Sequence, residues 1–191
     1  SRNRAVAHSL CRQSRKGNAM KLAAKLTAIV CFAIPVLSNE AVAQQNTLRQ
    51  QLVGTWTVLS FTNENERTGK KTDVFGSDPK GIFMFDETGR FSINLLRPGR
   101  PKFGYRDFPS VAAAKAALEG IITMFGTYKV NESEHSVSLD VIGGSYPTWD
   151  NSHQKRFITI NGDELTYRNP TPASGGGTAV VILKRAGTAE K

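Results

Sequence analysis

The segment 145–153 holds two aromatic residues, one carboxylate and one histidine, and is the stretch of this 191-residue chain best suited to chemistry. Asp150 and His153 could form a hydrogen-bonded pair in which the carboxylate orients the imidazole as a general acid or base. The alternative is a loop whose aromatic residues, including Trp149, fold down on the protein while its polar residues make turns. Asp150 and His153 are therefore the catalytic candidates. The interpretation of the segment as a loop with turns stays open.

Arginine residues are candidates for holding an anionic group. Four cations gather in one segment: Arg97, Arg100, Lys102 and Arg106. Arginine offers a planar fork of donors that fits a carboxylate or a phosphate. For this segment the alternative is ordinary solvated surface charge. Arg156 differs, because it stands beside Phe157 at the start of an apolar run. If this run is a strand of a β-barrel, its charge is expected to point into the barrel.

Other kinds of catalytic or metal site have little support. The chain has no Gly-rich phosphate loop and no signature of a metalloprotease or an esterase. It has three histidines, and one of them, His8, lies near the N-terminus, so a His-rich metal site is not expected. Cys11 and Cys31 are both near the N-terminus as well. We expect no metal and no cofactor.

Short runs of β-branched and aromatic residues, separated by turn residues, are typical of an antiparallel sandwich or barrel. Eight such runs occur, at 52–62, 81–86, 90–96, 126–131, 136–142, 154–160, 164–168 and 178–184. Asn161-Gly162 favours a two-residue hairpin between two of them. Closing eight sequential strands into a barrel would remove the sheet edges. The predicted fold class is all-β, an eight-stranded antiparallel up-and-down barrel.

One segment has a helical pattern. Apolar residues recur at spacings of three and four along 110–125. This predicts one amphipathic helix between the third and fourth strands, with its apolar face packed on a flank or opening of the sheet.

The N-terminal part has the layout of a secretory signal peptide, with lysines after Met20, an apolar run and Ala41-Val42-Ala43 before Gln44. The expected organisation is an unstructured basic extension at 1–19, a signal peptide at 20–43 and the barrel at 44–191. Seven of the 25 Lys and Arg residues and one of the 16 acidic residues precede residue 44, leaving 18 basic against 15 acidic residues. We therefore expect a periplasmic or secreted protein that binds no nucleic acid and, after cleavage, no membrane.

Several short motifs appear in an order that resembles the lipocalin-like domain family of bacteria. They are Gly54-x-Trp56, Val74-Phe75-Gly76 with Pro79-x-Gly81, Gly89-Arg90-Phe91-Ser92, Arg97-Pro98-Gly99-Arg100-Pro101, Phe125-Gly126-Thr127-Tyr128 and Pro147-x-Trp149. With Arg156 leading a strand, the resemblance covers residues 52 to about 185. It implies an eight-stranded barrel from a superfamily that mostly binds small apolar molecules and sometimes does chemistry.

The first hypothesis is a barrel that binds a small apolar or amphipathic molecule, which could carry an anionic group. Its ligand-binding candidates are Phe83, Phe85, Phe91, Ile93, Arg97, Tyr128, Trp149, Arg156 and Phe157. If Phe91 and Ile93 face inward, Ser92 between them faces outward. Structural roles are expected for Gly54 and for Trp56 with Arg185, which would become neighbours on barrel closure, the guanidinium over the indole.

Two further hypotheses stay open. The second is a small barrel enzyme of isomerase, cyclase or hydrolase type, which would use Asp150 with His153, or Arg156 with Tyr128. The third is an envelope module that interacts through the outside of the sheet.

Overall fold

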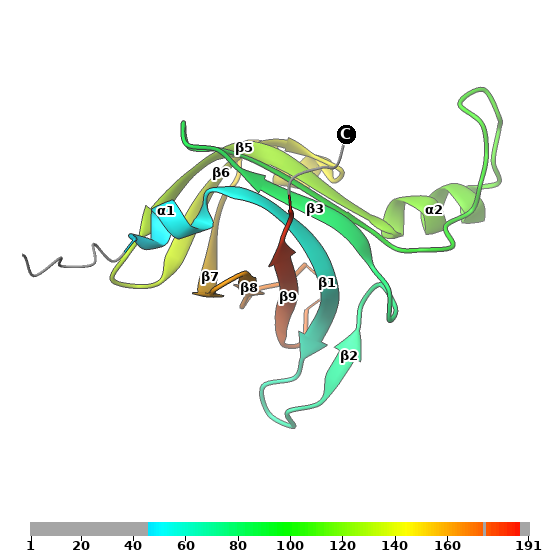
Figure 1. Cartoon of the computed structure of the whole chain (residues 1–191). Coiled ribbons are helices and arrows are strands. Elements are labelled where there is room, and N and C mark those ends of the chain that lie inside the picture. The colour runs from blue at the N-terminus through cyan, green and yellow to red at the C-terminus, as the bar shows by residue number, and fades with distance from the viewer. Residues whose placement is uncertain (1–45, 174, 188–191) are drawn as a thin grey trace, which may run out of the picture. The chain divides into compact units, whose positions relative to one another are not determined.

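Antiparallel strands form a closed barrel in the computed structural model, which describes residues 46–173 and 175–187 (Figure 1). The strands are β1 (Gly54–Glu64), β2 (Lys71–Asp73), β3 (Lys80–Phe85), β4 (Arg90–Leu96), β5 (Ile121–Asn131), β6 (Ser136–Gly144), β7 (His153–Asn161), β8 (Glu164–Asn169) and β9 (Thr178–Arg185). The helices are α1 (Leu48–Leu52), α2 (Val111–Glu119) and the 3-10 turn η1 (Pro147–Trp149).

The barrel closes because β1 pairs with β3 through its first residues and with β9 along most of its length. β3 to β9 then follow one another as antiparallel neighbours, which confirms the predicted eight-stranded up-and-down barrel. β2 is an addition, a three-residue strand paired with the far end of β1. It was not predicted, because Lys71-Thr72-Asp73 is exposed and has no alternating apolar pattern.

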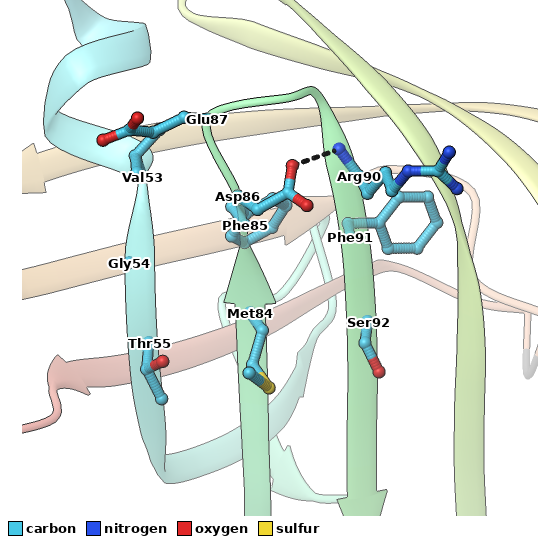
Figure 2. Close-up of a pocket in the computed structure, with 10 residues that line it drawn as sticks. All are labelled: Val53, Gly54, Thr55, Met84, Phe85, Asp86, Glu87, Arg90, Phe91 and Ser92. Atoms are coloured by element: carbon cyan, nitrogen blue, oxygen red, sulfur yellow. Dashed lines mark hydrogen bonds between the residues drawn. The ribbon is translucent and has the colours of Figure 1, made fainter.

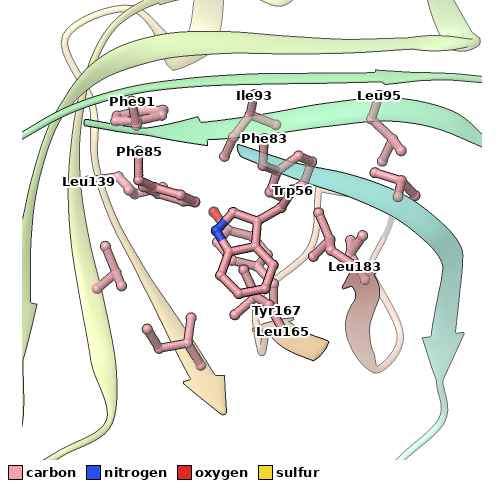
Figure 3. Packing of buried hydrophobic residues seen from close by; sticks show 14 of the residues in the cluster. Trp56, Phe83, Phe85, Phe91, Ile93, Leu95, Leu139, Leu165, Tyr167 and Leu183 are labelled. Carbon is pink, nitrogen blue, oxygen red and sulfur yellow. The ribbon is translucent and has the colours of Figure 1, made fainter. Parts of the chain in front are cut away.

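Strand alternation decides which side chains form the core. Phe91, Ile93 and Leu95 are buried while their neighbours on β4 are more exposed. Figure 3 shows these three side chains projecting from one face of β4 toward Trp56. Among the described residues, all members of the core cluster lie between Leu48 and Leu183, in α1, the barrel strands and the loop that holds Phe75.

The predicted helix is shorter than its apolar pattern suggested, and the strands on either side of it are numbered β4 and β5 in the structure, not third and fourth. α2 spans Val111–Glu119 and lies between β4 and β5, because β2 adds a strand before it. Gly120 ends the helix, and Ile121 and the following residues pair with β4. β-branched residues such as Ile121 and Ile122 favour a strand. No residue of α2 is buried, so the expected packing of its apolar face on the sheet does not occur.

The helix α1 covers one end of the barrel and was also not predicted, since residue 52 was assigned to the first strand. Thr47 caps it, accepting from the Gln50 backbone N–H. The Glu132 carboxylate accepts from the backbone N–H groups of Leu48 and Arg49, at 2.7 and 3.1 Å. These bonds satisfy amides that a helix N-terminus leaves free. They also tie α1 to the β5–β6 hairpin.

Trp56 and Arg185 complete this closed end. Arg185 donates to the carbonyls of Gln51 and Val53, which joins the last strand to the end of α1. Gly54 lies beneath this guanidinium with φ +132°, and a Cβ there would come within 3.0 Å of it. The sequence prediction that Trp56 and Arg185 become neighbours is confirmed. Among residues 46–173 and 175–187, no helix has the length and hydropathy needed to cross a membrane.

Candidate functional site

A cavity of about 790 Å³ lies at the end of the barrel away from α1. Its wall comes from the strand ends remote from that helix, for example Phe61 late in β1 and Val181 early in β9. The volume lies within the range of pockets that hold small molecules. The barrel therefore has one closed end and one end that opens on a cavity.

Most of the deep lining is apolar. The lining residues of this kind are Phe61, Val74, Phe75, Phe83, Ile93, Leu95, Ile122, Met124, Trp149, Ala179 and Val181. Phe83 meets the ring of Tyr167 edge to face, with 5.2 Å between ring centroids. An apolar wall of this kind favours a hydrocarbon or aromatic ligand.

Arg156 places a positive charge in this apolar wall. It is 7% exposed, although its neighbours on β7, Lys155 and Phe157, are exposed. Its guanidinium donates to the Lys155 carbonyl at 2.8 Å and to the side-chain oxygen of Gln154. Within the described part of the chain, no carboxylate lies within ion-pair distance of it. A buried charge with neutral partners only is costly, so this site favours an anion.

Tyr167 adds an unused polar group beside Arg156. Its hydroxyl is buried and has no hydrogen-bond partner among the described residues. Burial raises the pKa of Tyr167, and the nearby positive charge of Arg156 partly opposes this. The hydroxyl stays protonated at neutral pH and can donate to a ligand oxygen. Arg156 and Tyr167 are the buried polar residues of the cavity wall, and we call them the arginine–tyrosine pair.

A second cation and two more aromatic rings stand at the mouth. The Arg97 guanidinium lies 5.2 Å from the centroid of the Phe75 ring and donates to the Val74 carbonyl at 3.4 Å. On the other side, Tyr146 and Trp149 pack with 4.6 Å between their centroids. All of these residues line the cavity.

The proposed Asp150–His153 pair does not form. His153 Nδ1 lies 2.5 Å from a carboxylate oxygen of Asp140, its register partner across β6 and β7. Asp150 instead accepts from the backbone N–H of Gly144 at 3.2 Å. His153 lines the rim of the cavity, but its side chain is 86% exposed. The local loop pattern was misleading because the partner of His153 lies on the neighbouring strand.

The other proposed catalytic pair does not converge either. Tyr128 lies near the closed end, where its hydroxyl donates to the Asp86 carbonyl at 2.7 Å, and it does not line the cavity that contains Arg156. Burial raises the pKa of Tyr128. Within residues 46–173 and 175–187, no group of three or more His, Cys, Asp or Glu side chains is placed to hold a metal ion.

The predicted ligand-binding residues separate into three sets. Those that line the cavity are Phe83, Ile93, Arg97, Trp149 and Arg156. Phe85, Phe91 and Tyr128 are buried against one another nearer the closed end. Phe157 is 39% exposed on the outer face, where Lys155 lies over its ring, because alternation along β7 turns it away from Arg156.

A second, more open depression of about 460 Å³ lies near the β3–β4 turn and is drawn in Figure 2. Asp86 there accepts from the backbone N–H of Arg90 at 2.8 Å and from the Thr88 hydroxyl. These bonds lower the pKa of Asp86. Its carboxylate therefore serves the turn. The other charged residues of the depression, Glu87 and Arg90, are exposed to solvent, unlike the buried Arg156 of the cavity.

A closed antiparallel barrel with one end covered and an apolar cavity at the other defines the class of small-molecule-binding barrels. The sequence model of the lipocalin-like domain matches residues 53–186, from just before β1 to just after β9, and the chain belongs to this family. Lipocalin-like barrels generally bind small hydrophobic ligands. No curated protein matches the sequence.

Tyr167 is a site residue that was not predicted from the sequence. Leu165 and Tyr167 alternate with more exposed residues on β8, which is a signal that both point inward. Its position near Arg156 follows from the β7–β8 hairpin, in which Tyr167 is the register partner of Ile158. Its contact with Phe83 is long-range, and no local pattern contains it.

Proposed function

We propose that this barrel binds a small amphipathic anion, such as a fatty acid. The apolar part of the ligand would occupy the cavity, and its carboxylate would meet the arginine–tyrosine pair. The observation that carries the proposal is the buried Arg156 guanidinium, without a carboxylate partner in the described chain, beside the unpartnered Tyr167 hydroxyl. A ligand carboxylate would supply the missing counter-charge and accept from both groups.

The charge at the mouth agrees with an anionic ligand. Arg97 is free of carboxylate partners within the described residues, whereas Glu119, the lining acid nearby, is paired with Lys115. Lys155, also at the rim, is paired with Glu134 at 2.7 Å. Arg97 would therefore attract an approaching anion, and Arg156 would hold it.

The test compares myristate with tetradecanol, its neutral alcohol, on a protein of residues 44–191, which contains every core residue that the structure describes. Titration calorimetry should show that the acid binds at least about tenfold more tightly, since a charged hydrogen bond contributes about 1.5–3 kcal/mol. Arg156→Gln should remove this preference. Arg67→Gln, in the exposed turn after β1, is the matched control and should keep it.

The outcomes separate the two parts of the proposal. Equal affinity for acid and alcohol would refute the role of the arginine–tyrosine pair while leaving an apolar site. Absence of saturable binding by either compound would refute amphipath binding altogether.

We also propose that the protein acts outside the cytoplasm, after cleavage between Ala43 and Gln44. Cleavage there would leave α1, with its cap at Thr47, and every core residue in place. The test is the N-terminal residue of the protein recovered from the periplasm or medium of an expressing cell. Gln44 is expected, and an intact chain found only in the cytoplasm would contradict the proposal.

A further inference from the structure

The connection between β4 and β5 extends away from the barrel. Figure 1 shows it as a long loop followed by α2, standing clear of the strands. It makes few links to the barrel; the Arg97 backbone N–H donates to the Gly120 carbonyl at its base, and Tyr146 donates to Leu118. We call residues 97–119 the projecting segment.

The projecting segment exposes large apolar side chains. Tyr105 and Phe108 are fully exposed, and Val111 is 87% exposed. Phe103 and Leu118 are 43% and 46% exposed. Scattered single apolar residues are common on surfaces, but a run of them on one projection indicates a binding surface.

Cations are interleaved with these apolar residues. Arg100, Lys102 and Arg106 alternate with the aromatic residues between 99 and 109. None of the three has a carboxylate within ion-pair distance among residues 46–173 and 175–187. The one acid of this loop, Asp107, is occupied by the backbone N–H of Gly104. The same loop thus carries both the positive charges and the exposed apolar side chains.

We propose that the projecting segment docks the barrel on the surface of an anionic phospholipid bilayer. Tyr105 and Phe108 would enter the interface between head groups and acyl chains, where aromatic residues are favoured. Arg100, Lys102 and Arg106 would meet the phosphates. This revises the expectation from sequence that the processed protein contacts no membrane.

The shape and charge of the segment favour a bilayer over a folded protein partner. The exposed rings stand on a convex projection, which enters a soft interface without needing a complementary pocket. The unpaired cations match a surface of dense negative charge. The base of the segment, Arg97 and Glu119, also lines the cavity, so docking would bring the mouth near the lipid. The docking itself does not depend on which ligand the cavity takes.

The test measures co-sedimentation of residues 44–191 with vesicles of phosphatidylglycerol and of phosphatidylcholine. We expect binding to the anionic vesicles that weakens as salt is raised, and at least tenfold weaker binding to phosphatidylcholine. Tyr105→Ser with Phe108→Ser, and separately Arg100→Glu with Lys102→Glu, should each lower binding at least tenfold. Circular dichroism and thermal unfolding establish that each variant is folded.

Two matched controls alter exposed residues elsewhere. Leu59→Ser with Ile142→Ser removes apolar side chains that are 50% and 52% exposed on the strands. Arg67→Glu with Lys70→Glu reverses two exposed charges in the β1–β2 turn. Both controls should bind as the unaltered protein does. The proposal is overturned if anionic vesicles are not bound at low salt, or if both projecting-segment variants bind normally. Dimers that form through Phe108 without vesicle binding would also overturn it.

Discussion

The guanidinium carbon of Arg185 lies 4.1 Å from the ring centroid of Trp56, and the two residues are register partners on β9 and β1. Trp56 is fully buried and its indole N–H donates to the Leu52 carbonyl at 2.8 Å. Through these two contacts Trp56 joins the first strand to the last strand and to α1.

Replacing Arg185 should weaken the closed end. Arg185→Met removes the cation over the indole and two hydrogen bonds to carbonyls. We expect a loss of about 1–3 kcal/mol in the free energy of unfolding, measured by urea denaturation. The exposed neighbour Lys184→Met is the control and should change it little. A variant Arg185→Met as stable as the unaltered protein would show that the contact contributes nothing.

Replacing Arg156 should have the opposite effect on stability in the absence of ligand. Arg156→Met removes a buried charge that lacks a carboxylate partner in the described structure, so we expect unfolding to become harder by about 0.5–2 kcal/mol. Affinity for myristate should fall at the same time. The control is Arg168→Met, which breaks the 3.2 Å ion pair with Glu64 and should not increase the stability of the fold. Thermal unfolding with and without myristate separates the two effects, and a destabilised Arg156→Met would contradict the argument.

Glu64 should make stability depend on acid pH. The hydrogen bond from Lys71, 2.7 Å away, and the weaker effect of Arg168 lower the pKa of Glu64 below its ordinary value of 4.5, against an opposing effect of burial. A carboxyl with a lowered pKa in the folded state stabilises the fold above its unfolded pKa, and this is lost as pH falls through the folded value.

The measurement is urea denaturation of Glu64→Gln across the acid range. The variant should be less stable than the unaltered protein by about 0.5–1 kcal/mol at neutral pH, with the difference shrinking below about pH 4.5. Glu164→Gln, at the start of β8, is the control. A difference that does not change with pH would mean that the ion pair is not its cause.

Gly126 should not accept a side chain. β5 has a register shift between Phe125 and Gly126, and a Cβ on Gly126 would overlap the Asp140 carbonyl oxygen on β6. Backbone must move to relieve this overlap, so Gly126→Ala should cost at least about 2 kcal/mol of stability. Gly187→Ala, where a Cβ meets nothing, is the control. Chemical denaturation compares them, and equal stability would show that the bulge adapts.

Strand positions could be predicted from sequence because burial alternates along each strand, as Phe91, Ser92 and Ile93 do on β4. The end of α2 could not be predicted from apolar spacing, because Ile121 and Ile122 continue the helical spacing of apolar residues although their β-branched side chains favour a strand. Their pairing with β4 decides for the strand.

In the candidate site, too, some features could be predicted from the sequence and others depend on strand pairing. Arg156 could be recognised from its place in an apolar run, but the partners of His153 and Tyr167 could not. Asp140 meets His153 through the register of β6 and β7, and Tyr167 meets Phe83 across the barrel interior. The first contact depends on the exact register of two neighbouring strands, and the second depends on closure of the whole sheet.

Closure of the barrel by β1 and β9 has a consequence for the order of folding. Trp56 on the first barrel strand contacts Arg185 on the last, so the contact has one of the largest sequence separations in the domain. Contacts of this kind slow folding, because a long stretch of chain must be ordered before they form. During synthesis the first strand emerges long before the last, and its unpaired backbone stays open to other chains in that interval. The nascent chain cannot finish its barrel until residue 185 has left the ribosome.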